Sequence, residues 1–402
     1  MAGSSVFAGS GIQGNHPPYK SSGGNFYCVV ITANVISPTL DVYKAIDPTS
    51  SWTVQDAADN PVLISGTYLG YQTVQEGDVI HIVAWQTSDI IHYYTFDMSS
   101  DQWVEDEQAL QTSNTVVNPW VGIARRTSPA ATIICYAGDP DSVMGDTKQR
   151  VDYAIRPDSS GTWDTVDAAL DAGGDVFYGQ PNCIEGTNSQ IHFVWQRQID
   201  TTKGDPIAWE SSQGRTLDSS DDSLSTTDDS TADSSNQLLG GTNLVTYDDS
   251  GTQRVIANFL VGSNLWTAQG TEDGSDDLVL VATGVSEAFT NPPRFTSGRA
   301  IFSMAALDAD IHGVFSGGGS FGIDSDLYYI TSTDDGASWT DTEETDALTV
   351  NFVSANIYVR GTNTVLAYLY DSAGTQYYDE KILVAGVFLP FYPNKQNTLL
   401  RM

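Results

Sequence analysis

The stretch 332-STDDGASW-339 carries the clearest fold signal in this 402-residue chain. In such a turn an Asp side chain accepts hydrogen bonds from nearby backbone N–H groups, and a Gly supplies positive φ. The Trp that ends the segment buries a large ring beneath the hairpin. Degenerate Asp-turn-Trp copies stand at residues 47–52 (DPTSSW), 97–103 (DMSSDQW) and 158–163 (DSSGTW), and a remnant, SSQGRTL, ends at Leu217. One kind of hairpin is therefore repeated along the chain.

Seven apolar segments with a similar pattern mark the same strand of a repeating unit. Their marker residues are 53 to 63 residues apart, and a period of about 55 residues fits four strands with their turns, which is one blade of a β-propeller. The markers are Cys28, His81, Cys135, His192, Val255, His312 and Val365. The sequence thus predicts an all-β fold, a single β-propeller of seven four-stranded blades, with six blades as the alternative.

The repeats also set the expected boundaries. The blades span about residues 14–60, 61–114, 115–174, 175–237, 238–288, 289–348 and 349–387. Because the seventh unit lacks an obvious fourth strand, residues 1–13 are expected to return as its outer strand and to close the ring. Residues 218–237 are acidic and of low complexity, which predicts a flexible outer loop.

The 332–339 segment matches the pattern S-x-D-x-G-x-[TS]-W in every fixed position. It resembles the Asp-box hairpins of sialidases, BNR-repeat proteins and related propellers. The resemblance implies a peripheral hairpin between the third and fourth strands of a blade, with a structural role. The residues given this role are Asp47, Trp52, Asp97, Trp103, Asp158, Trp163, Ser332, Asp334, Gly336 and Trp339.

Charge is the most unusual property of the composition. Seventeen basic residues against 51 acidic ones give a net charge of -34. Such a surface repels nucleic acid and anionic membranes, so a nucleic-acid partner is not expected. The Asp-rich, Lys-poor composition resembles that of proteins that work in molar salt and indicates a halophilic source, with an ordinary acidic extracellular or virion protein as the alternative. No apolar run reaches the roughly 18 residues of a membrane helix, and the first 20 residues do not read as a secretory signal.

The predicted inner strands hold several residues with catalytic or ligand-binding potential. A sialidase would need three arginines around a carboxylate, an acid/base and a Tyr activated by a Glu, and the Arg-Ile-Pro type motif of that family is lacking. The candidate ligand-facing residues are Arg125, Arg126, Arg294, Arg299 and Arg360, and Glu185 and Tyr358 lie near predicted inner strands. Nothing in the sequence fixes their mutual geometry. No catalytic group is therefore assigned, and a non-enzymatic protein is expected, with sialidase-like or other glycoside hydrolysis as the alternative.

Three further classes of residue could in principle support metal or redox chemistry. The acidic loop with Asp139, Asp141 and Asp146 suits a hard cation such as calcium, although neither it nor the one at Asp273, Asp276 and Asp277 matches an EF-hand, and solvated carboxylates are the alternative. His81, His192 and His312 occupy matching strand positions in different repeats, so packed histidines are expected rather than a zinc site. Cys28, Cys135 and Cys183 stand within or beside apolar segments, which predicts buried free thiols.

The C-terminal residues 388–402 differ from the acidic body. They are aromatic, interrupted by Pro and basic, which predicts an extended docking peptide, with a tail folded over the ring's bottom face as the alternative. The architecture resembles propeller domains of viral spikes, turrets and tail fibres, including those of tailed viruses of halophilic archaea. The resemblance implies a homo-oligomeric virion surface protein, not inserted in a membrane, that binds a host glycan or glycoprotein. A purely structural capsid decoration protein is a further alternative.

Overall fold

The fold is taken from a computed structural model of the chain. It describes residues 4–8, 16–31, 39–57, 59–61, 71–87, 90–111, 115–139, 150–163, 165–171, 178–186, 189–197, 208–213, 216–217, 222–223, 244–261, 264–272, 278–280, 286–289, 302–317, 326–345, 350–372, 374–384 and 398–399. Within these ranges the regular structure is entirely β-strand. Among the residues described, no helix has the length and apolar character needed to cross a membrane.

The described strands form seven sheets, numbered here in chain order. Sheet 1 contains β2 (Tyr19–Lys20), β3 (Phe26–Ile31), β4 (Leu40–Ala45) and β5 (Thr53–Gln55). Sheet 2 contains β6 (Tyr71–Glu76), β7 (Val79–Thr87), β8 (Ile90–Asp97) and β9 (Gln102–Gln111). Sheet 3 contains β10 (Thr115–Thr127), β11 (Ala130–Asp139), β12 (Arg150–Pro157) and β13 (Thr165–Asp171). Sheet 4 contains β14 (Tyr178–Glu185), β15 (Ile191–Arg197), β16 (Ala208–Gln213), β17 (Thr216–Leu217) and β18 (Asp222–Ser223).

The remaining three sheets complete the described part of the chain. Sheet 5 contains β19 (Leu244–Asp249), β20 (Thr252–Val261), β21 (Asn264–Glu272), β22 (Leu278–Leu280) and β23 (Ser286–Phe289). Sheet 6 contains β24 (Phe302–Leu307), β25 (Asp310–Gly317), β26 (Asp326–Ser332), β27 (Thr340–Thr345) and β31 (Thr398–Leu399). Sheet 7 contains β28 (Val350–Arg360), β29 (Asn363–Ser372), β30 (Thr375–Val384) and β1 (Ser4–Ala8).

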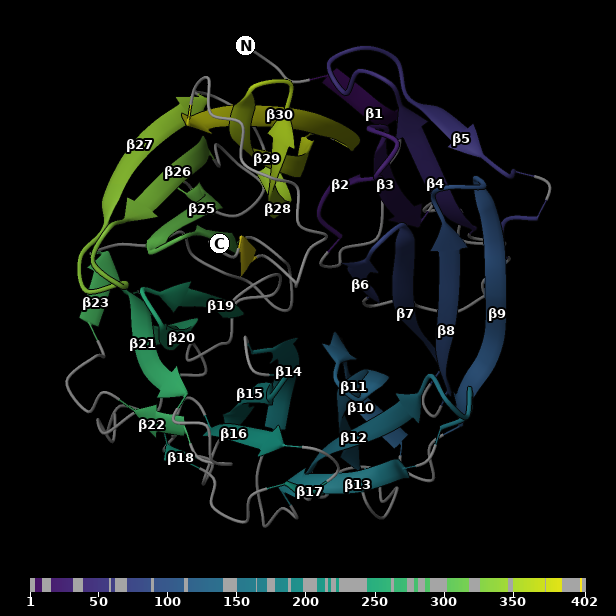
Figure 1. The fold of residues 1–402 in the computed structure, drawn as a ribbon, viewed down its shortest axis with the longest axis vertical. Helices are drawn as coiled ribbons and strands as arrows, with labels where there is room; N and C mark the ends of the chain where they lie inside the picture. The colour runs from purple at the N-terminus through teal and green to yellow at the C-terminus, as the bar shows by residue number, and fades with distance from the viewer. Residues whose placement is uncertain are drawn as a thin grey trace.

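Within each sheet, four main strands pair antiparallel and step outward from the middle of the molecule (Figure 1). Sheets of this kind, arranged face to face around a central axis, make a β-propeller, so the prediction of an all-β propeller is confirmed. Sheets 4, 5 and 6 each hold a fifth short strand, where four strands were expected. The N-terminal strand β1 pairs antiparallel with β30, with Ser4 opposite Tyr378, which is the pairing expected from the seventh repeat. Strand β31 pairs in parallel with β24, with Thr398 beside Ala306. This short strand lies near the centre of Figure 1.

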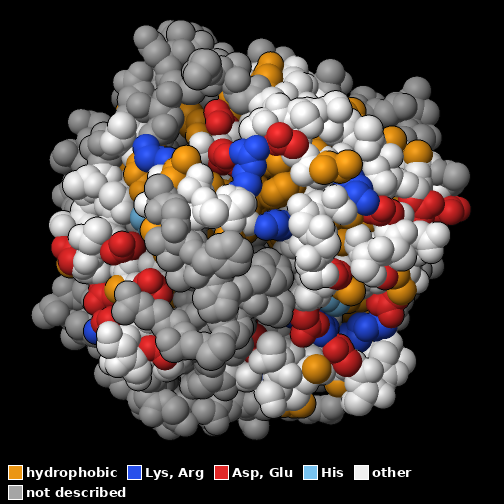
Figure 2. Space-filling view, turned by 45° about the horizontal axis from the view of Figure 1, so that its top comes forward, with side chains coloured by type: hydrophobic (Ala, Val, Ile, Leu, Met, Phe, Trp, Pro, Cys, Tyr) orange, Lys and Arg blue, Asp and Glu red, His pale blue; other side chains and the backbone are white. Residues whose placement is uncertain are grey.

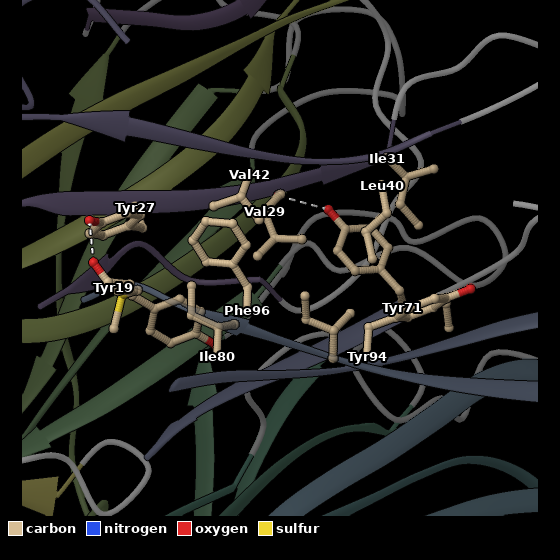
Figure 3. Packing of buried hydrophobic residues seen from close by; sticks show 13 residues of the cluster. Tyr19, Tyr27, Val29, Ile31, Leu40, Val42, Tyr71, Ile80, Tyr94 and Phe96 are labelled. Atoms are coloured by element: carbon tan, nitrogen blue, oxygen red, sulfur yellow. Dashed lines mark hydrogen bonds between the residues drawn. The ribbon is translucent and has the colours of Figure 1, made fainter. Parts of the chain in front are cut away.

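Alternate residues of one strand pack against different neighbouring sheets. Along β3, Tyr27, Val29 and Ile31 join a cluster with residues of sheet 2 (Figure 3), where the Tyr71 hydroxyl donates to the Val29 carbonyl at 3.1 Å. Cys28, between them, packs into a cluster with residues of sheet 7. Because successive side chains of a strand point to opposite faces, a sheet with a neighbour on both faces is apolar at every position. This is why β3, FYCVVI, is buried along its whole length.

Polar contacts join each described sheet to the next, including the last to the first. They are Tyr19 to Thr73, Ile123 N to Gln72, Thr127 to Glu185, Thr246 to the Glu185 carbonyl, Tyr247 to Asp335, Ala355 N to Ser303, and Asn356 to the Pro18 carbonyl. Buried polar groups lose free energy unless they are hydrogen-bonded. These contacts therefore fix the rotation of each sheet against its neighbour, as well as satisfying its polar atoms.

Two prolines lie inside strands, and one predicted loop needs adjustment. Pro119 and Pro181 lie inside β10 and β14, where the register shifts. A Pro has no N–H to donate, and a register irregularity is a place where a strand tolerates that loss. Of the predicted loop 218–237, the described residues 222–223 pair with β16 as β18. The rest of that loop lies outside the described residues.

Candidate functional site

The 332–339 segment forms the turn between β26 and β27. Asp334 Oδ1 accepts hydrogen bonds from the Ser338 backbone N–H and the Ser332 hydroxyl, both at 2.8 Å. Gly336 has a φ of 82°, and the Trp339 indole N–H donates to its carbonyl at 3.1 Å. Burial alone would raise the pKa of Asp334, but the bonds from Ser338 and Ser332 outweigh it, so the pKa is lowered. This aspartate is the anionic centre of its own turn.

In two degenerate copies the Asp is again the acceptor of its turn, but both bonds come from the residue two positions later. Asp47 Oδ1 accepts from the Thr49 backbone N–H at 3.0 Å and from its hydroxyl at 2.8 Å. Asp97 Oδ1 accepts from the Ser99 backbone N–H at 2.8 Å and from its hydroxyl at 2.7 Å. The pattern of an Asp followed by a hydroxyl residue two positions later therefore builds the same turn in sheets 1 and 2.

The four Trp residues share a second feature. Each packs into the seam between its own sheet and the preceding one: Trp52 with sheet 7, Trp103 with sheet 1, Trp163 with sheet 2 and Trp339 with sheet 5. Trp163 meets the Tyr93 ring edge-on, with centroids 5.8 Å apart. An aromatic ring of this size buries much apolar area. The Asp-turn-Trp segments thus act in sheet-to-sheet packing.

Arg125, a candidate ligand-facing residue, is a clamp between sheets 2 and 3. Its Nε and Nη2 donate to Glu76 Oε2 at 2.9 and 2.5 Å. Its Nη1 and Nη2 donate to the two carboxylate oxygens of Asp158, at 2.9 and 2.6 Å, and Nη1 also donates to the Thr132 hydroxyl at 2.7 Å. The side chain is only 5% exposed. Its donors are therefore committed to protein acceptors.

The other residues that the sequence placed near the inner strands differ in their surroundings. Arg126 is buried and its Nε donates to the Pro129 carbonyl at 3.0 Å. Arg294 and Arg299 lie outside the described residues. Glu185 is buried, and its Oε1 accepts from the Thr127 backbone N–H at 2.6 Å, so it joins sheets 3 and 4.

Arg360, at the end of β28, lies at an open seam between sheets 7 and 1. Its Nη2 donates to Asp47 Oδ1 at 2.7 Å, and its Nη1 bonds Glu380 Oε1. In contrast to Arg125, its side chain is 29% exposed. Burial alone would lower the pKa of Arg360, but the hydrogen bond to Glu380 and the charges of Glu380 and Asp47 raise it. The guanidinium thus stays charged and bridges two sheets, and solvent still reaches it.

A hollow of about 550 Å³ surrounds this bridge, within the range of small-molecule sites. Ile46, 84% exposed, stands on one side of it. Figure 2 shows basic side chains lying beside hydrophobic and acidic ones on one face of the molecule. The lining residues are Lys20, Gly24, Phe26, Ile46, Asp47, Arg360, Gly361, Thr362, Asn363, Val365 and Glu380. The hollow therefore combines charge, hydroxyl and amide groups with an exposed apolar side chain, and it is the candidate functional site.

Lys20 supplies the second cation of the hollow. Its Nζ donates to the Val359 carbonyl and lies 5.8 Å from the centre of the Phe26 ring. Burial lowers the pKa of Lys20. Its ammonium is therefore directed at the protein's own carbonyl and ring.

Tyr358, which the sequence placed near an inner strand, lies beneath the hollow. Its hydroxyl is 2.5 Å from the Tyr378 hydroxyl, which donates to Glu380 Oε2 at 2.8 Å. Both rings are buried. Burial raises the pKa of both phenols well above the usual value. These hydroxyls hold Glu380 in place from below and are not open to a ligand.

The three histidines lie in three different sheets. His81 Nδ1 is 2.5 Å from the Tyr93 hydroxyl, and His312 Nδ1 is 2.7 Å from the Tyr329 hydroxyl, so the same pair recurs in sheets 2 and 6. His192 is buried in sheet 4. Burial and the charge of Lys381 lower the pKa of His312 to about 4. These are packed strand histidines, as predicted.

The calcium candidates are only partly described. Asp139 is the last residue of β11, whereas Asp141, Asp146 and the residues from Asp273 to Asp277 lie outside the described ranges. In the part of the chain that the structure covers, no three His, Cys, Asp or Glu side chains cluster as metal ligands would. All three cysteines are free and buried, which confirms that prediction.

The sequence did not single out most of the hollow. Asp47 was assigned to its turn alone, and Ile46, Lys20 and Glu380 were given no role. The one available signal was the apolar Ile46 directly before a turn aspartate, in AIDPTSSW. A single exposed apolar residue is common on protein surfaces and is uninformative until its neighbours are known.

Among known proteins, the chain is similar to solved structures in fold. No protein-family model and no curated protein matches the chain. Among solved structures, an α-L-arabinofuranosidase of Fusarium graminearum, bound to an iminosugar inhibitor, is 10% identical with a TM-score of 0.51 over 95% of this chain and 98% of that one. A Dyadobacter fermentans protein of unknown function is 10% identical with a TM-score of 0.50, over 96% and 98%.

Other solved structures that match include a lectin and sialidases. The Trypanosoma rangeli sialidase is 11% identical with a TM-score of 0.46, over 93% of this chain and 55% of that one. The Aleuria aurantia lectin is 11% identical with a TM-score of 0.46, over 82% and 94%. At such identities the likeness is one of β-propeller fold, and a fold hosts many functions.

Proposed function

We propose that this chain is a non-enzymatic virion surface protein, a component of a spike, turret or tail fibre, whose rigid β-propeller binds a host receptor or glycan. The observation that carries the proposal is the hollow at Arg360. There Ile46 is 84% exposed beside a guanidinium that two carboxylates hold in place. Rigid polar groups next to an apolar contact are what a small polar ligand needs for orientation and affinity.

The groups of the hollow favour binding over hydrolysis. A glycosidase of the usual kind needs one carboxylic acid that stays protonated to donate to the leaving group. The Thr49 backbone N–H, with its hydroxyl and Arg360, lowers the pKa of Asp47 instead. The buried Tyr358 and Tyr378 hydroxyls do not reach a ligand in the hollow. Glycoside hydrolysis is therefore the second candidate.

The scaffold belongs to the proposal as well. We infer that the seven described sheets are seven blades of one ring, which β1 closes by pairing with β30. The polar contacts that join each sheet to the next, and the last to the first, support this arrangement. A strand supplied from the other end of the chain covers the part of the β30 edge from Thr375 to Tyr378.

Assembly in a particle rests on composition and on the tail. The net charge of -34 suits a protein from a halophilic source, whose self-repulsion is screened in molar salt. In that case the melting temperature rises steeply between roughly 0.1 and 2 M KCl, and a flat profile would contradict it. Within the basic, aromatic tail 388–402, β31 pairs with β24 of the same chain, which favours the alternative of a tail folded onto the ring for this short part. The rest of the tail is proposed to dock on other virion proteins, in a homo-oligomeric assembly that neither binds nucleic acid nor enters the membrane.

A glycan array probed in molar salt, with fluorogenic glycosides assayed in parallel, tests the function. We expect binding to a defined set of glycans without turnover, and binding that falls at least tenfold in Ile46→Ala. Val104→Ala is the matched control, because Val104 is also exposed, at 62%, but lies on β9 away from the hollow. Turnover that Asp47→Asn abolishes would establish the hydrolase instead. If no glycan or host surface is bound, a structural decoration protein takes the place of the proposal.

A further inference from the structure

We infer that the hollow at Arg360 selects a neutral, hydroxyl-rich sugar ring and disfavours acidic sugars. This inference rests on the proposed glycan-binding function and adds the class of ligand. It depends on which atoms of the hollow are already committed to protein partners, and on which remain open to solvent.

Of the two cations of the hollow, the guanidinium is already paired with carboxylates and the ammonium is bonded to a carbonyl. The two terminal nitrogens of Arg360 bind two different carboxylates, Asp47 and Glu380. Lys20 donates to the Val359 carbonyl and faces the Phe26 ring. A ligand carboxylate would compete with Asp47 and Glu380 for the terminal nitrogens of Arg360, and with the Val359 carbonyl for Lys20. Bidentate recognition of an anion through both terminal nitrogens of Arg360 is therefore disfavoured.

The charged atom left open to a ligand at Asp47 is an acceptor. Asp47 Oδ1 is occupied by Thr49 and Arg360. Its Oδ2 has no protein partner among the described residues, and the Asp47 side chain is 55% exposed. A carboxylate accepts hydrogen bonds and donates none while it is ionised. It therefore binds ligand hydroxyl groups through charge-assisted hydrogen bonds and repels a ligand carboxylate.

The rest of the hollow fits the same ligand. Ile46 offers an apolar surface to the C–H face of a sugar ring, and burying it against the ligand adds hydrophobic free energy. Thr362 adds a hydroxyl that both donates and accepts. The protein as a whole carries a charge of -34, so its field also disfavours an anionic ligand at low salt. Each of these features points to a neutral ring.

Matched glycan pairs test the selectivity on the full-length protein. Each pair shares one core and differs only in a terminal neutral hexose or a terminal acidic sugar. We expect the neutral member to bind at least tenfold more tightly in molar salt, by calorimetry. Calcium and EDTA arms show whether a cation on Asp47 carries the binding, and binding lost in EDTA overturns the inference.

A pair of variants locates the effect at Asp47. Asp47→Asn keeps the shape and an acceptor oxygen for Thr49 but removes the carboxylate charge, and neutral-glycan affinity should fall about tenfold. Asp97→Asn is the matched control, because Asp97 makes the same turn bonds to Ser99 outside the hollow, and it should leave affinity unchanged. Equal effects of the two variants overturn the inference.

Different results would contradict the selectivity for neutral sugars and the glycan-binding function. If the acidic member of each pair binds more tightly, or Asp47→Asn strengthens neutral binding, the inference is wrong and glycan binding stands. If neither member binds, the glycan-binding function is wrong, and the choice of sugar falls with it.

Discussion

Two arginines in this propeller bridge neighbouring sheets, yet they differ in what they leave exposed. Arg125 and Arg360 each bind one carboxylate of an Asp-turn-Trp segment, Asp158 and Asp47, and one further glutamate. Arg125 makes five hydrogen bonds to side chains and is 5% exposed, whereas Arg360 is 29% exposed and borders a hollow. The first arrangement holds the scaffold together. The second holds polar groups at a surface where a ligand can reach them.

The largest expected effect concerns the sheet that carries Arg360. Deleting residues 1–13 removes β1, exposes the outer edge of β30 and takes the buried Val6 out of the seam with sheet 1. We expect the melting temperature to fall by several degrees and an opened edge to promote aggregation. Scanning calorimetry and light scattering measure both.

Point variants on the two faces of β1 control for the deletion. Val6→Asp should reproduce most of the loss, because Val6 is buried, while Ser5→Asp should not, because Ser5 is exposed. An undisturbed Val6→Asp protein would show that β1 does not pack as described.

Removing the buried clamp is the next effect in size. Arg125→Ala leaves Glu76 and Asp158 facing each other without their cation, and breaking a buried pair costs about 3–5 kcal/mol. Both carboxylates are more than a third exposed, so water offsets part of this, and we expect about 2–3 kcal/mol in urea unfolding. Arg125→Lys should recover only part of it, because an ammonium lacks the planar fork. If Arg125→Ala lowers the free energy of unfolding by less than Arg360→Ala does, Arg125 is not the more important of the two arginines for stability.

Lowering the pH should reduce the stability of the protein through His81, which lies near Arg125 between sheets 2 and 3. Burial, then the charges of Arg125 and Arg156, hold the pKa of His81 well below its usual value. As pH falls below about 6.5 the unfolded chain takes up a proton before the folded one, so stability declines until the folded-state pKa is reached. His81→Gln should therefore lose less stability between pH 7.5 and 5 than the parent protein, by urea titration at each pH.

A double variant tests whether the clamp is the cause. In the Arg125→Ala background one of the repelling charges is gone, so the contribution of His81 to acid sensitivity should shrink. His312→Gln serves as the matched control: the pKa of His312 is lowered to about 4 by burial and Lys381, so its contribution should be the same in both backgrounds. If the contribution of His81 to acid sensitivity is the same with and without Arg125, burial alone lowers the pKa of His81.

The smallest effect on stability is expected at the open bridge. Exposed ion pairs contribute about 0–1 kcal/mol, so Arg360→Ala should cost less than about 1 kcal/mol in the same urea assay. Glycan binding should nevertheless fall at least tenfold, since Asp47 and Glu380 lose the group that positions them. A destabilisation as large as that of Arg125→Ala would show that the bridge at Arg360 is structural too.

The fold was predictable because its signals are local. A turn such as that of Asp47 with Thr49 depends on only three consecutive residues. The repeat period follows from the spacing of the apolar strands. The hollow was not predictable, because it joins Asp47 to Arg360, which are 313 residues apart. Sequence alone also could not separate Arg125 from Arg360, since both precede turns at the ends of inner strands, and only burial distinguishes them. The roles of Arg294, Arg299, Asp141 and Asp146 stay predictions outside the described residues.

The pairing of β1 with β30 has a consequence for how the protein is made. About 370 residues separate the two strands, and ribosomes add about 5–20 residues per second. Strand β1 therefore waits roughly 20 to 75 seconds for its partner to be synthesised. During that interval Val6 and its neighbours are available to chaperones, to other nascent chains and to proteases. Slowing translation should lengthen this vulnerable interval and lower the yield of the full-length protein, but leave unchanged that of a chain without residues 1–13.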